Sequence, residues 1–175
     1  MESKFFLTGS PGSGKSTVFM KILEMISSQD FKVGGIYTPE LRITGERVGF
    51  YVRDIASGAQ KIMAGVDIVS VYRVGKYFID LDRFESVAIP ALDYAEKECD
   101  VIGIDEIGRM ELFSKAFEQK VNGLLTGRKP LLAVVHRNYI EKYKEKGILY
   151  TVDVVNRNQM PGLIFFKMTR LLRIL

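Results

Sequence analysis

The sequence is poor in the side chains that most often build disulfide frameworks and metal centres. It has one cysteine, Cys99, and one histidine, His136, among 175 residues. A lone cysteine excludes an intramolecular disulfide and a zinc cluster of cysteines, and a lone histidine argues against a histidine-based metal site. No run of 18 uncharged apolar residues occurs, and the N-terminal "MESKFFLTG" lacks a signal-peptide pattern. We therefore expect a cytoplasmic protein without a membrane-spanning segment.

Strong net charge is also missing. The formal charge is +4, from 25 Lys and Arg against 21 Asp and Glu. This mild excess suits an anionic ligand, but no Lys/Arg block resembles a nucleic-acid-binding tail, so nucleic acid is a weaker alternative as partner. Hydrophobic residues make up 47% of the chain and charged residues 26%, which is ordinary for a globular protein. The length favours a single domain, and we expect a monomer or a weak oligomer.

Both ends of the chain alternate short apolar runs with helical patterns. Buried strands are expected at 4–8, 31–39, 101–105, 130–137 and 148–155. Helices are expected at 15–28, 114–125, 139–146 and 161–172. Ser114 and Asn138 are predicted to cap the second and third helices, Gly147 to end the third and Pro161 to open the last. This alternation predicts a mainly parallel α/β sheet covered by helices on both faces.

The middle of the chain follows a different pattern. Apolar and other residues alternate over 41–62, with turn signals at "TGE" and "SG", which indicates an antiparallel meander. The run 71–80 is expected to add one more strand. Pro90 disfavours a helical conformation at the residue before it, so we expect a turn at 82–88 and a helix at 90–98. The predicted organisation is one domain over 1–175, with an antiparallel insertion at about 41–80.

A glycine-rich loop separates the first strand from the first helix. Its sequence matches G-x-x-x-x-G-K-[ST] in full, over Gly9, Ser10, Pro11, Gly12, Ser13, Gly14, Lys15 and Ser16. The glycines let backbone N–H groups surround a phosphate chain, and the helix beginning at Lys15 directs its positive end at the same anion. Lys15 is expected to reach the outer phosphates, Ser16 to ligate Mg²⁺, and Thr17 to add a contact nearer the sugar. The alternative is a glycine-rich turn that matches the motif by chance, and the position between a strand and a helix argues against it.

Two adjacent acids end the strand 101–105. Ligands of a parallel sheet collect at the carboxyl ends of its strands, so Asp105 and Glu106 are predicted to face the phosphates held by the glycine loop. We assign Asp105 to the Mg²⁺ shell and Glu106 to holding an attacking water as a general base. The alternatives are a strand-end cap for Asp105 and a surface acid for Glu106.

The stretches "GSPGSGKST" and "IDEIGRMEL" together resemble the THEP1-type nucleoside-triphosphatase family. Further similar stretches are "VGKYFIDLDRFESVAIPAL" (74–92) and "VVNRNQMPGL" (154–163), so that the resemblance covers nearly the whole chain. It implies a three-layer α/β/α P-loop NTPase of RecA-like type that hydrolyses several nucleoside triphosphates with Mg²⁺. By matching position, Glu111 becomes a second candidate for positioning water.

Several further side chains are candidates for contacts with the substrate. Arg109 either neutralises charge on the phosphate in the transition state or pairs with Glu111. In the RecA-like strand order, His136 and Arg137 end a strand between the two motif strands, so that either could sense the terminal phosphate or bond to a neighbouring loop. Near the last strand, Asn156 could bind a base edge and Arg157 could stack on the base. The alternative for this segment is a structural one, in which Asn158 caps the last helix.

The sequence thus predicts Mg²⁺-dependent hydrolysis of ATP, GTP, CTP and UTP to diphosphate and phosphate. A small nucleotide or nucleoside kinase shares the glycine loop, but kinases of that kind carry an arginine-rich lid, and we find no such insertion between 106 and 150. A second alternative is a module that uses nucleotide to engage nucleic acid or a protein. Phosphate release without an added acceptor separates the hydrolase from the kinase.

Overall fold

A computed structural model describes residues 3–174, in which one sheet runs through the molecule. The strands are β1 (Lys4–Thr8), β2 (Val33–Tyr37), β3 (Glu40–Ile43), β4 (Glu46–Asp54), β5 (Gln60–Gly65), β6 (Arg73–Val74), β7 (Tyr77–Ile79), β8 (Val101–Ile107), β9 (Leu131–Val135) and β10 (Ile148–Thr151). The helices are α1 (Lys15–Ser27), α2 (Leu81–Glu98), α3 (Lys115–Thr126), α4 (Ile140–Tyr143) and α5 (Met160–Leu172). Short 3₁₀ helices lie at η1 (Glu111–Phe113), η2 (Arg137–Tyr139) and η3 (Lys144–Lys146).

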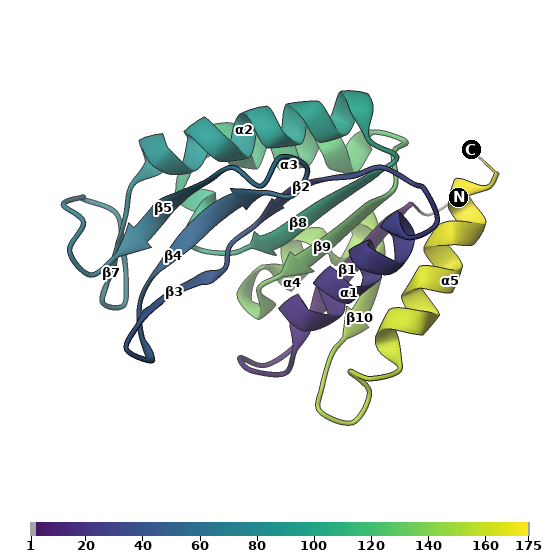
Figure 1. The fold of residues 1–175 in the computed structure, drawn as a ribbon, viewed down its shortest axis with the longest axis horizontal. Helices are drawn as coiled ribbons and strands as arrows, with labels where there is room; N and C mark the ends of the chain where they lie inside the picture. Colours follow the sequence, from purple (N-terminus) through teal and green to yellow (C-terminus); the bar gives the residue numbers. More distant parts are fainter. Residues whose placement is uncertain (1–2, 175) are drawn as a thin grey trace.

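The half of the sheet built from the chain ends is parallel. Its strands lie in the order β10-β1-β9-β8-β2. Helices α1 and α5 cover one face of it and α2 and α3 the other (Figure 1). Because both faces are covered, the side chains of β1 and β9 are buried throughout, which explains their continuous apolar sequences. The three-layer α/β/α prediction is confirmed.

The other half of the sheet is antiparallel. Strand β4 pairs with β2 on one side and with β5 on the other, and β3 pairs with β4 beside this path. The single strand predicted at 71–80 is wrong. This run forms a small hairpin, β6–β7, in which Val74 pairs with Tyr77 across a turn where Gly75 has φ +59°. Glycine adopts this left-handed conformation without a steric penalty. The chain therefore reverses direction at a point where the residue pattern predicted one continuous strand.

The prediction of a turn at 82–88 is also wrong, because α2 runs without a break through Pro90. The side chain of Asp80 caps the helix by accepting from the backbone N–H of Arg83. A proline inside a helix costs about 3 kcal/mol. The helix buries Phe84 and Leu92 on the sheet, among other apolar residues, and each such side chain contributes roughly 1.5–3 kcal/mol. Packing along the whole helix therefore outweighs the local penalty.

Caps and ends were predicted with mixed success. Ser114 caps α3 by accepting from the backbone N–H of Phe117, as expected. The predicted cap at Asn138 is wrong, because His136 accepts from the backbone N–H of Asn138, and the segment after it divides into η2, α4 and η3. Strand β8 continues to Ile107, two residues beyond the predicted end. Within residues 3–174, no helix combines the length and apolar character that crossing a membrane requires.

Candidate functional site

The glycine loop joins β1 to α1 in a conformation that only glycine accommodates at its two ends. Gly14, the N-cap of α1, has φ +99°. Gly9 has φ +145°, and a Cβ there would lie 2.2 Å from the carbonyl oxygen of Val152. Lys15 folds back over the loop, where its Nζ donates to the carbonyl oxygens of Gly9 at 3.1 Å and Ser10 at 2.9 Å. The loop thus holds its own cation at the N-terminal end of α1.

Two buried hydroxyl groups in and next to this loop have no hydrogen-bond partner. They are Thr8 Oγ1, at the end of β1, and Ser13 Oγ, inside the loop. Buried polar atoms are almost always satisfied, so atoms without partners indicate a place that a ligand or water completes. Both residues belong to the segment that carries Lys15, and donors gathered in this segment suit an anion with several acceptor oxygens, such as a phosphate chain.

A β-bulge brings Asp105 and Glu106 to the same cleft. Asp105 lies opposite Val134 of β9, and Ile107 lies opposite the next residue, Val135, so that Glu106 is the additional residue. The peptide bond between Asp105 and Glu106 is cis. Adjacent side chains of a regular strand point to opposite faces, but a bulge re-aims one of them. Both carboxylates line a cleft of about 360 Å³ together with Lys15 and Ser16.

Burial controls the charge of these acids. Burial raises the pKa of Asp105 to about 7, helped by the neighbouring Glu106, while a hydrogen bond from Ser16 and the charge of Lys15 oppose the shift. Burial also raises the pKa of Glu106, against the effect of Lys15. Glu111 is buried in η1, and burial together with Glu106 raises its pKa well above the usual range. Carboxyl groups clustered in this way bind protons readily unless cations enter the cleft.

The other charged candidates lie on the rim of the same cleft. Arg109 and Arg137 are both exposed and line it. Although both residues are within the described part of the chain, no ion pair joins Arg109 to Glu111, so the pairing alternative is wrong. His136 also lines the cleft, and burial together with Arg137 and Lys15 lowers its pKa, which favours a neutral imidazole. Its Nδ1 accepts from Asn138 at 3.3 Å, which leaves Nε2 for other contacts.

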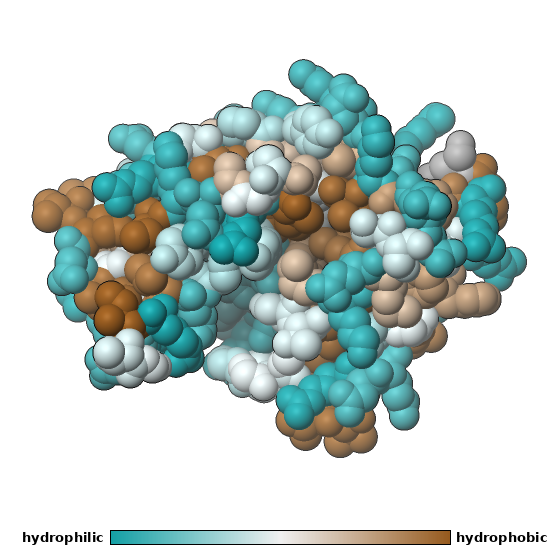
Figure 2. Space-filling view, in the orientation of Figure 1, coloured by the Kyte–Doolittle hydropathy of each residue, from teal (hydrophilic) through white to brown (hydrophobic). Residues whose placement is uncertain are grey.

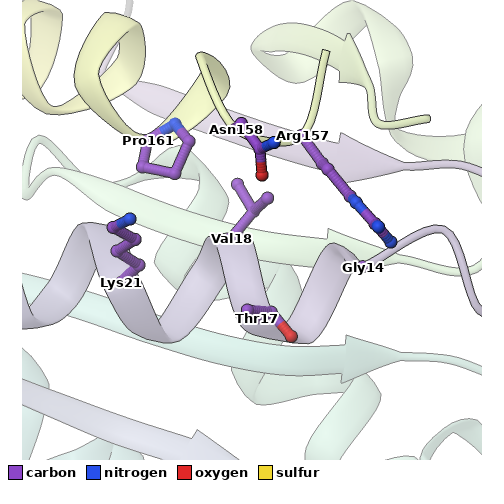
Figure 3. A pocket seen from close by; sticks show the side chains of 7 residues that line it. All are labelled: Gly14, Thr17, Val18, Lys21, Arg157, Asn158 and Pro161. Atoms are coloured by element: carbon purple, nitrogen blue, oxygen red, sulfur yellow. The ribbon is translucent and has the colours of Figure 1, made fainter. Parts of the chain in front are cut away.

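A second cavity, of about 250 Å³, lies between the start of α1 and the segment that leads into α5 (Figure 3). Arg157 reaches across to Gly14, where its Cδ is 3.3 Å from the position of a Cβ. Asn158 lines the cavity, and the alternative role as a helix cap is wrong, because the N-cap of α5 is Gln159. The amide of Asn156 is used inside its own loop, since it accepts from the N–H of Asp153 at 3.0 Å and donates to the carbonyl of Thr151 at 2.9 Å. The structure therefore brings Arg157 and Asn158 to the cavity, and Asn156 supports the loop.

The sequence reasoning missed the opposite wall of the larger cleft. Thr38, Glu40, Arg47 and Phe50, which lie on or next to the antiparallel strands, line it. Thr38 directly follows β2 and donates to the backbone carbonyl of Asp105 at 3.0 Å. The rule that ligands gather at the carboxyl ends of parallel strands was a usable signal for Thr38. No local signal identified Arg47, because its place depends on how β4 pairs.

A phosphate-binding loop after one parallel strand and carboxylates at the end of another define a P-loop nucleoside triphosphatase of α/β/α architecture. A family model described as "NTPase" matches residues 4–165. The protein named "Nucleoside-triphosphatase THEP1" from Methanocaldococcus jannaschii is 40% identical over 157 residues, which cover 90% of this chain and 92% of the relative. The chain belongs to the THEP1 nucleoside-triphosphatase family.

Two solved structures that resemble this chain agree with the family assignment. The crystal structure of THEP1 from Aquifex aeolicus matches with a TM-score of 0.82 and 32% identity, covering 92% of this chain and 96% of that one. The solution structure titled as a human cancer-related nucleoside triphosphatase matches with a TM-score of 0.78 and 32% identity, covering 95% and 97%. The predictions of family, fold class and enzyme class are confirmed.

Proposed function

We propose that this nucleoside-triphosphatase depends on Mg²⁺ and accepts ATP, GTP, CTP and UTP, releasing diphosphate and inorganic phosphate. The observation that carries the proposal is the joint lining of one cleft by Lys15, Ser16, Asp105 and Glu106. A phosphate-binding cation, a hydroxyl, a metal-type carboxylate and a basic carboxylate are the groups that hydrolysis of a phosphoanhydride by water requires.

The loop and Lys15 bind the phosphate chain. Backbone N–H groups of Gly9–Ser16 surround the inner phosphates, and the Lys15 ammonium exchanges its bonds to the Gly9 and Ser10 carbonyls for bonds to the outer phosphate oxygens. Thr17 lines the neighbouring cavity, and we propose that it adds a contact nearer the sugar. These contacts fix the terminal phosphate for attack without depending on the base.

Ser16 and Asp105 are suited to hold Mg²⁺. Within residues 3–174, no group of three or more His, Cys, Asp or Glu side chains has the arrangement of a complete metal site. This fits Mg²⁺, which is commonly held by one or two protein oxygens while phosphates and water supply the rest. Ser16 and Asp105 line the same cleft, so an oxygen of each would be available to one ion bound there. When bound, the ion neutralises negative charge on the phosphates.

Glu106 is proposed to take the proton of the attacking water. The water oxygen bonds to the terminal phosphorus as the bond from that phosphorus to the bridging oxygen breaks, and the bridging oxygen leaves with the electron pair on the diphosphate. The raised pKa of Glu106 makes its carboxylate a stronger base than an exposed glutamate. Glu111 lies beside Glu106 and is the alternative holder of the water, while Arg109 and Arg137 on the rim are placed to offset phosphate charge.

Base discrimination is proposed to be weak. The cavity between α1 and the last loop offers Arg157 and Asn158 for stacking and hydrogen bonding, on exposed segments. We expect kcat/KM to vary within about tenfold among the four nucleotides, which corresponds to about 1.4 kcal/mol.

We propose one P-loop NTPase domain with an antiparallel insertion at about 41–80, acting on free nucleotides without a nucleic-acid or membrane partner. The continuous sheet in which β2 pairs with both β8 and β4 supports this. Sedimentation and hydrolysis measured with and without added RNA or DNA, across salt concentrations, test it.

The experiment that tests the function is phosphate release from ATP, GTP, CTP and UTP without any acceptor, in Mg²⁺ and in EDTA. We expect release in Mg²⁺ from all four and none in EDTA. Release that requires an added nucleoside or nucleotide acceptor would support the kinase instead. Activity unchanged by EDTA would contradict the Mg²⁺ proposal.

A further inference from the structure

Arg47 occupies the wall of the large cleft that faces the glycine loop. It lies near the start of β4, in the antiparallel half of the sheet, and lines the cleft together with Lys15 and Glu106. Figure 2 shows the surface hollowed between the antiparallel strands and the start of α1. An anionic group bound in this cleft therefore has both a lysine and this arginine in the lining around it.

The guanidinium of Arg47 is held in place before any substrate binds. Its Nε donates to the phenol oxygen of Tyr77 at 3.0 Å, and its Nη1 donates to Glu40 at 2.7 Å. It also lies over the rings of Phe50, at 5.4 Å, and Tyr77, at 5.8 Å. An arginine has five N–H donors, so these two bonds leave others available. The side chain is 44% exposed, which keeps it accessible from the cleft.

The charge of Arg47 is only partly neutralised by its partner. Glu40 pairs with Arg42 as well, at 2.7 Å, so one carboxylate is shared between two guanidinium groups. The cluster of Glu40, Arg42 and Arg47 therefore keeps an excess of positive charge beside the phosphate site. Arg109 and Arg137 are cationic too, but within residues 3–174 neither has a side-chain hydrogen bond or ion pair like those that hold Arg47, so ordering their long side chains on binding costs entropy.

We propose that Arg47 is a catalytic residue that donates hydrogen bonds to the terminal phosphate and stabilises the charge on its oxygens in the transition state. Glu40 and Tyr77 are the positioning residues that orient its guanidinium. Arg47 transfers no proton: the water proton still passes to Glu106 and the electron pair still leaves with the diphosphate. The inference rests on the proposed hydrolysis. It supplies within this chain the cation that other P-loop enzymes receive from an arginine finger.

The same contacts also suit a purely structural tie between β3, β4 and β7, and Arg53 provides a matched control for that role. It lies on the same strand, its Nη1 donates to the phenol of Tyr37 at 2.7 Å and its Nε to Gln60 at 2.7 Å, and it stacks over the Tyr37 ring at 5.4 Å. It does not line the cleft. A structural arginine and a catalytic one should therefore differ in kinetics and agree in stability.

The experiment compares Arg47→Ala, Arg47→Lys, Tyr77→Phe and Arg53→Ala with the parent. Steady-state kcat and KM, thermal stability, and the affinity for Mg²⁺–ADP with and without aluminium fluoride are measured. We expect Arg47→Ala to lower kcat by about 10²–10³, the usual cost of losing one transition-state donor, with KM and ADP affinity within about threefold. The tightening of ADP binding by aluminium fluoride should disappear. Arg47→Lys should recover part of kcat, Tyr77→Phe should lower it less than Arg47→Ala, and Arg53→Ala should stay within about twofold of the parent.

Two results would overturn the inference. One is an Arg47→Ala protein with the parent's kcat and the parent's response to aluminium fluoride. The other is an equal loss of kcat and stability in Arg47→Ala and Arg53→Ala, which would make both structural. If Arg47→Ala fails to fold, the same measurements on Arg47→Lys are compared with those on the parent and on Arg53→Ala. A parent that releases no phosphate would contradict the proposed function, and the aluminium fluoride measurement would still decide whether Arg47 contacts the phosphate-like anion.

Discussion

Glu106 and Glu111 converge on Gly108, which separates their carboxyl groups. A Cβ at Gly108 would lie 2.6 Å from Oε1 of Glu106 and 3.0 Å from Oε2 of Glu111. The missing side chain is therefore what allows the two acids to approach each other. Because Glu106 reaches the cleft from a bulge in β8 and Glu111 from η1, the spacing between the carboxyl groups depends on this one residue.

Gly108→Ala is expected to lower kcat by about 10- to 100-fold while the protein stays folded. The methyl group displaces the end of the Glu106 side chain, and catalytic groups tolerate misplacement of about 1 Å poorly. Gly123→Ala in α3 is the control, because a Cβ there meets nothing within 4 Å. It should leave kcat unchanged and stabilise the helix by about 0.5–1 kcal/mol. Unchanged turnover in Gly108→Ala would show that the carboxyl spacing is unimportant.

Glu106→Gln and Asp105→Asn are expected to give different phenotypes. Glu106→Gln should lower the single-turnover rate by roughly 10²–10⁴, the range for a positioned base, while Mg²⁺–nucleotide still binds. Asp105→Asn should raise the Mg²⁺ concentration needed for half-maximal activity. Hydrolysis and nucleotide affinity measured across a Mg²⁺ titration distinguish them. If Glu111→Gln, in place of Glu106→Gln, gives the large loss of rate with binding intact, then Glu111 holds the water.

Glu111→Gln is expected to stabilise the protein above pH 4.5 when nucleotide and Mg²⁺ are absent. The folded-state pKa of Glu111 is raised well above 4.5, so the folded state keeps a proton that the unfolded chain releases. Stability from this group is therefore complete below about pH 4.5 and is lost as the pH rises through the folded-state pKa. Glutamine removes that loss, so the difference from the parent should grow between pH 5 and pH 8.

Denaturant unfolding at pH 5, 6, 7 and 8 measures this difference. Glu98→Gln at the exposed end of α2 is the control, and its pH dependence should run parallel to the parent's. A constant difference between Glu111→Gln and the parent at every pH would contradict a proton held at Glu111.

Asn156 and Asn158 are expected to differ although they are two residues apart. Asn156→Ala removes two hydrogen bonds of its loop and should lower the free energy of unfolding by about 1–3 kcal/mol without changing the order of preference among bases. Asn158→Ala should change stability by less than about 0.5 kcal/mol, and should alter the ratios of kcat/KM among ATP, GTP, CTP and UTP. If Asn156→Ala alters the preference among bases and Asn158→Ala does not, then Asn156 contacts the base.

The sequence was informative where chemistry is local. The glycine loop is contiguous and its residue types follow from phosphate binding, and Asp105 and Glu106 end an apolar strand, so both could be placed at one mouth of a parallel sheet. Pro90 misled because its penalty is local, whereas the packing that overcomes it comes from the sheet. Arg47 could not be identified as a site residue from the sequence, because its position in the cleft depends on strand pairing in the middle of the chain. Whether Asn156 or Asn158 faces the cavity depends on hydrogen bonds within a loop, which no spacing rule encodes.

If Lys15 binds phosphate as proposed, its bonds to the carbonyl oxygens of Gly9 and Ser10 make that binding a competition between two sets of acceptors. Before substrate arrives, the backbone oxygens solvate the ammonium, so the loop and the lysine keep each other in shape. A phosphate oxygen must displace an acceptor that is already satisfied, and the net gain is the difference between two good hydrogen-bonded states. Ligands with too little charge therefore gain little from Lys15. We therefore expect the proposed contact of Lys15 with phosphate to favour a nucleoside triphosphate over a diphosphate product, which carries less charge.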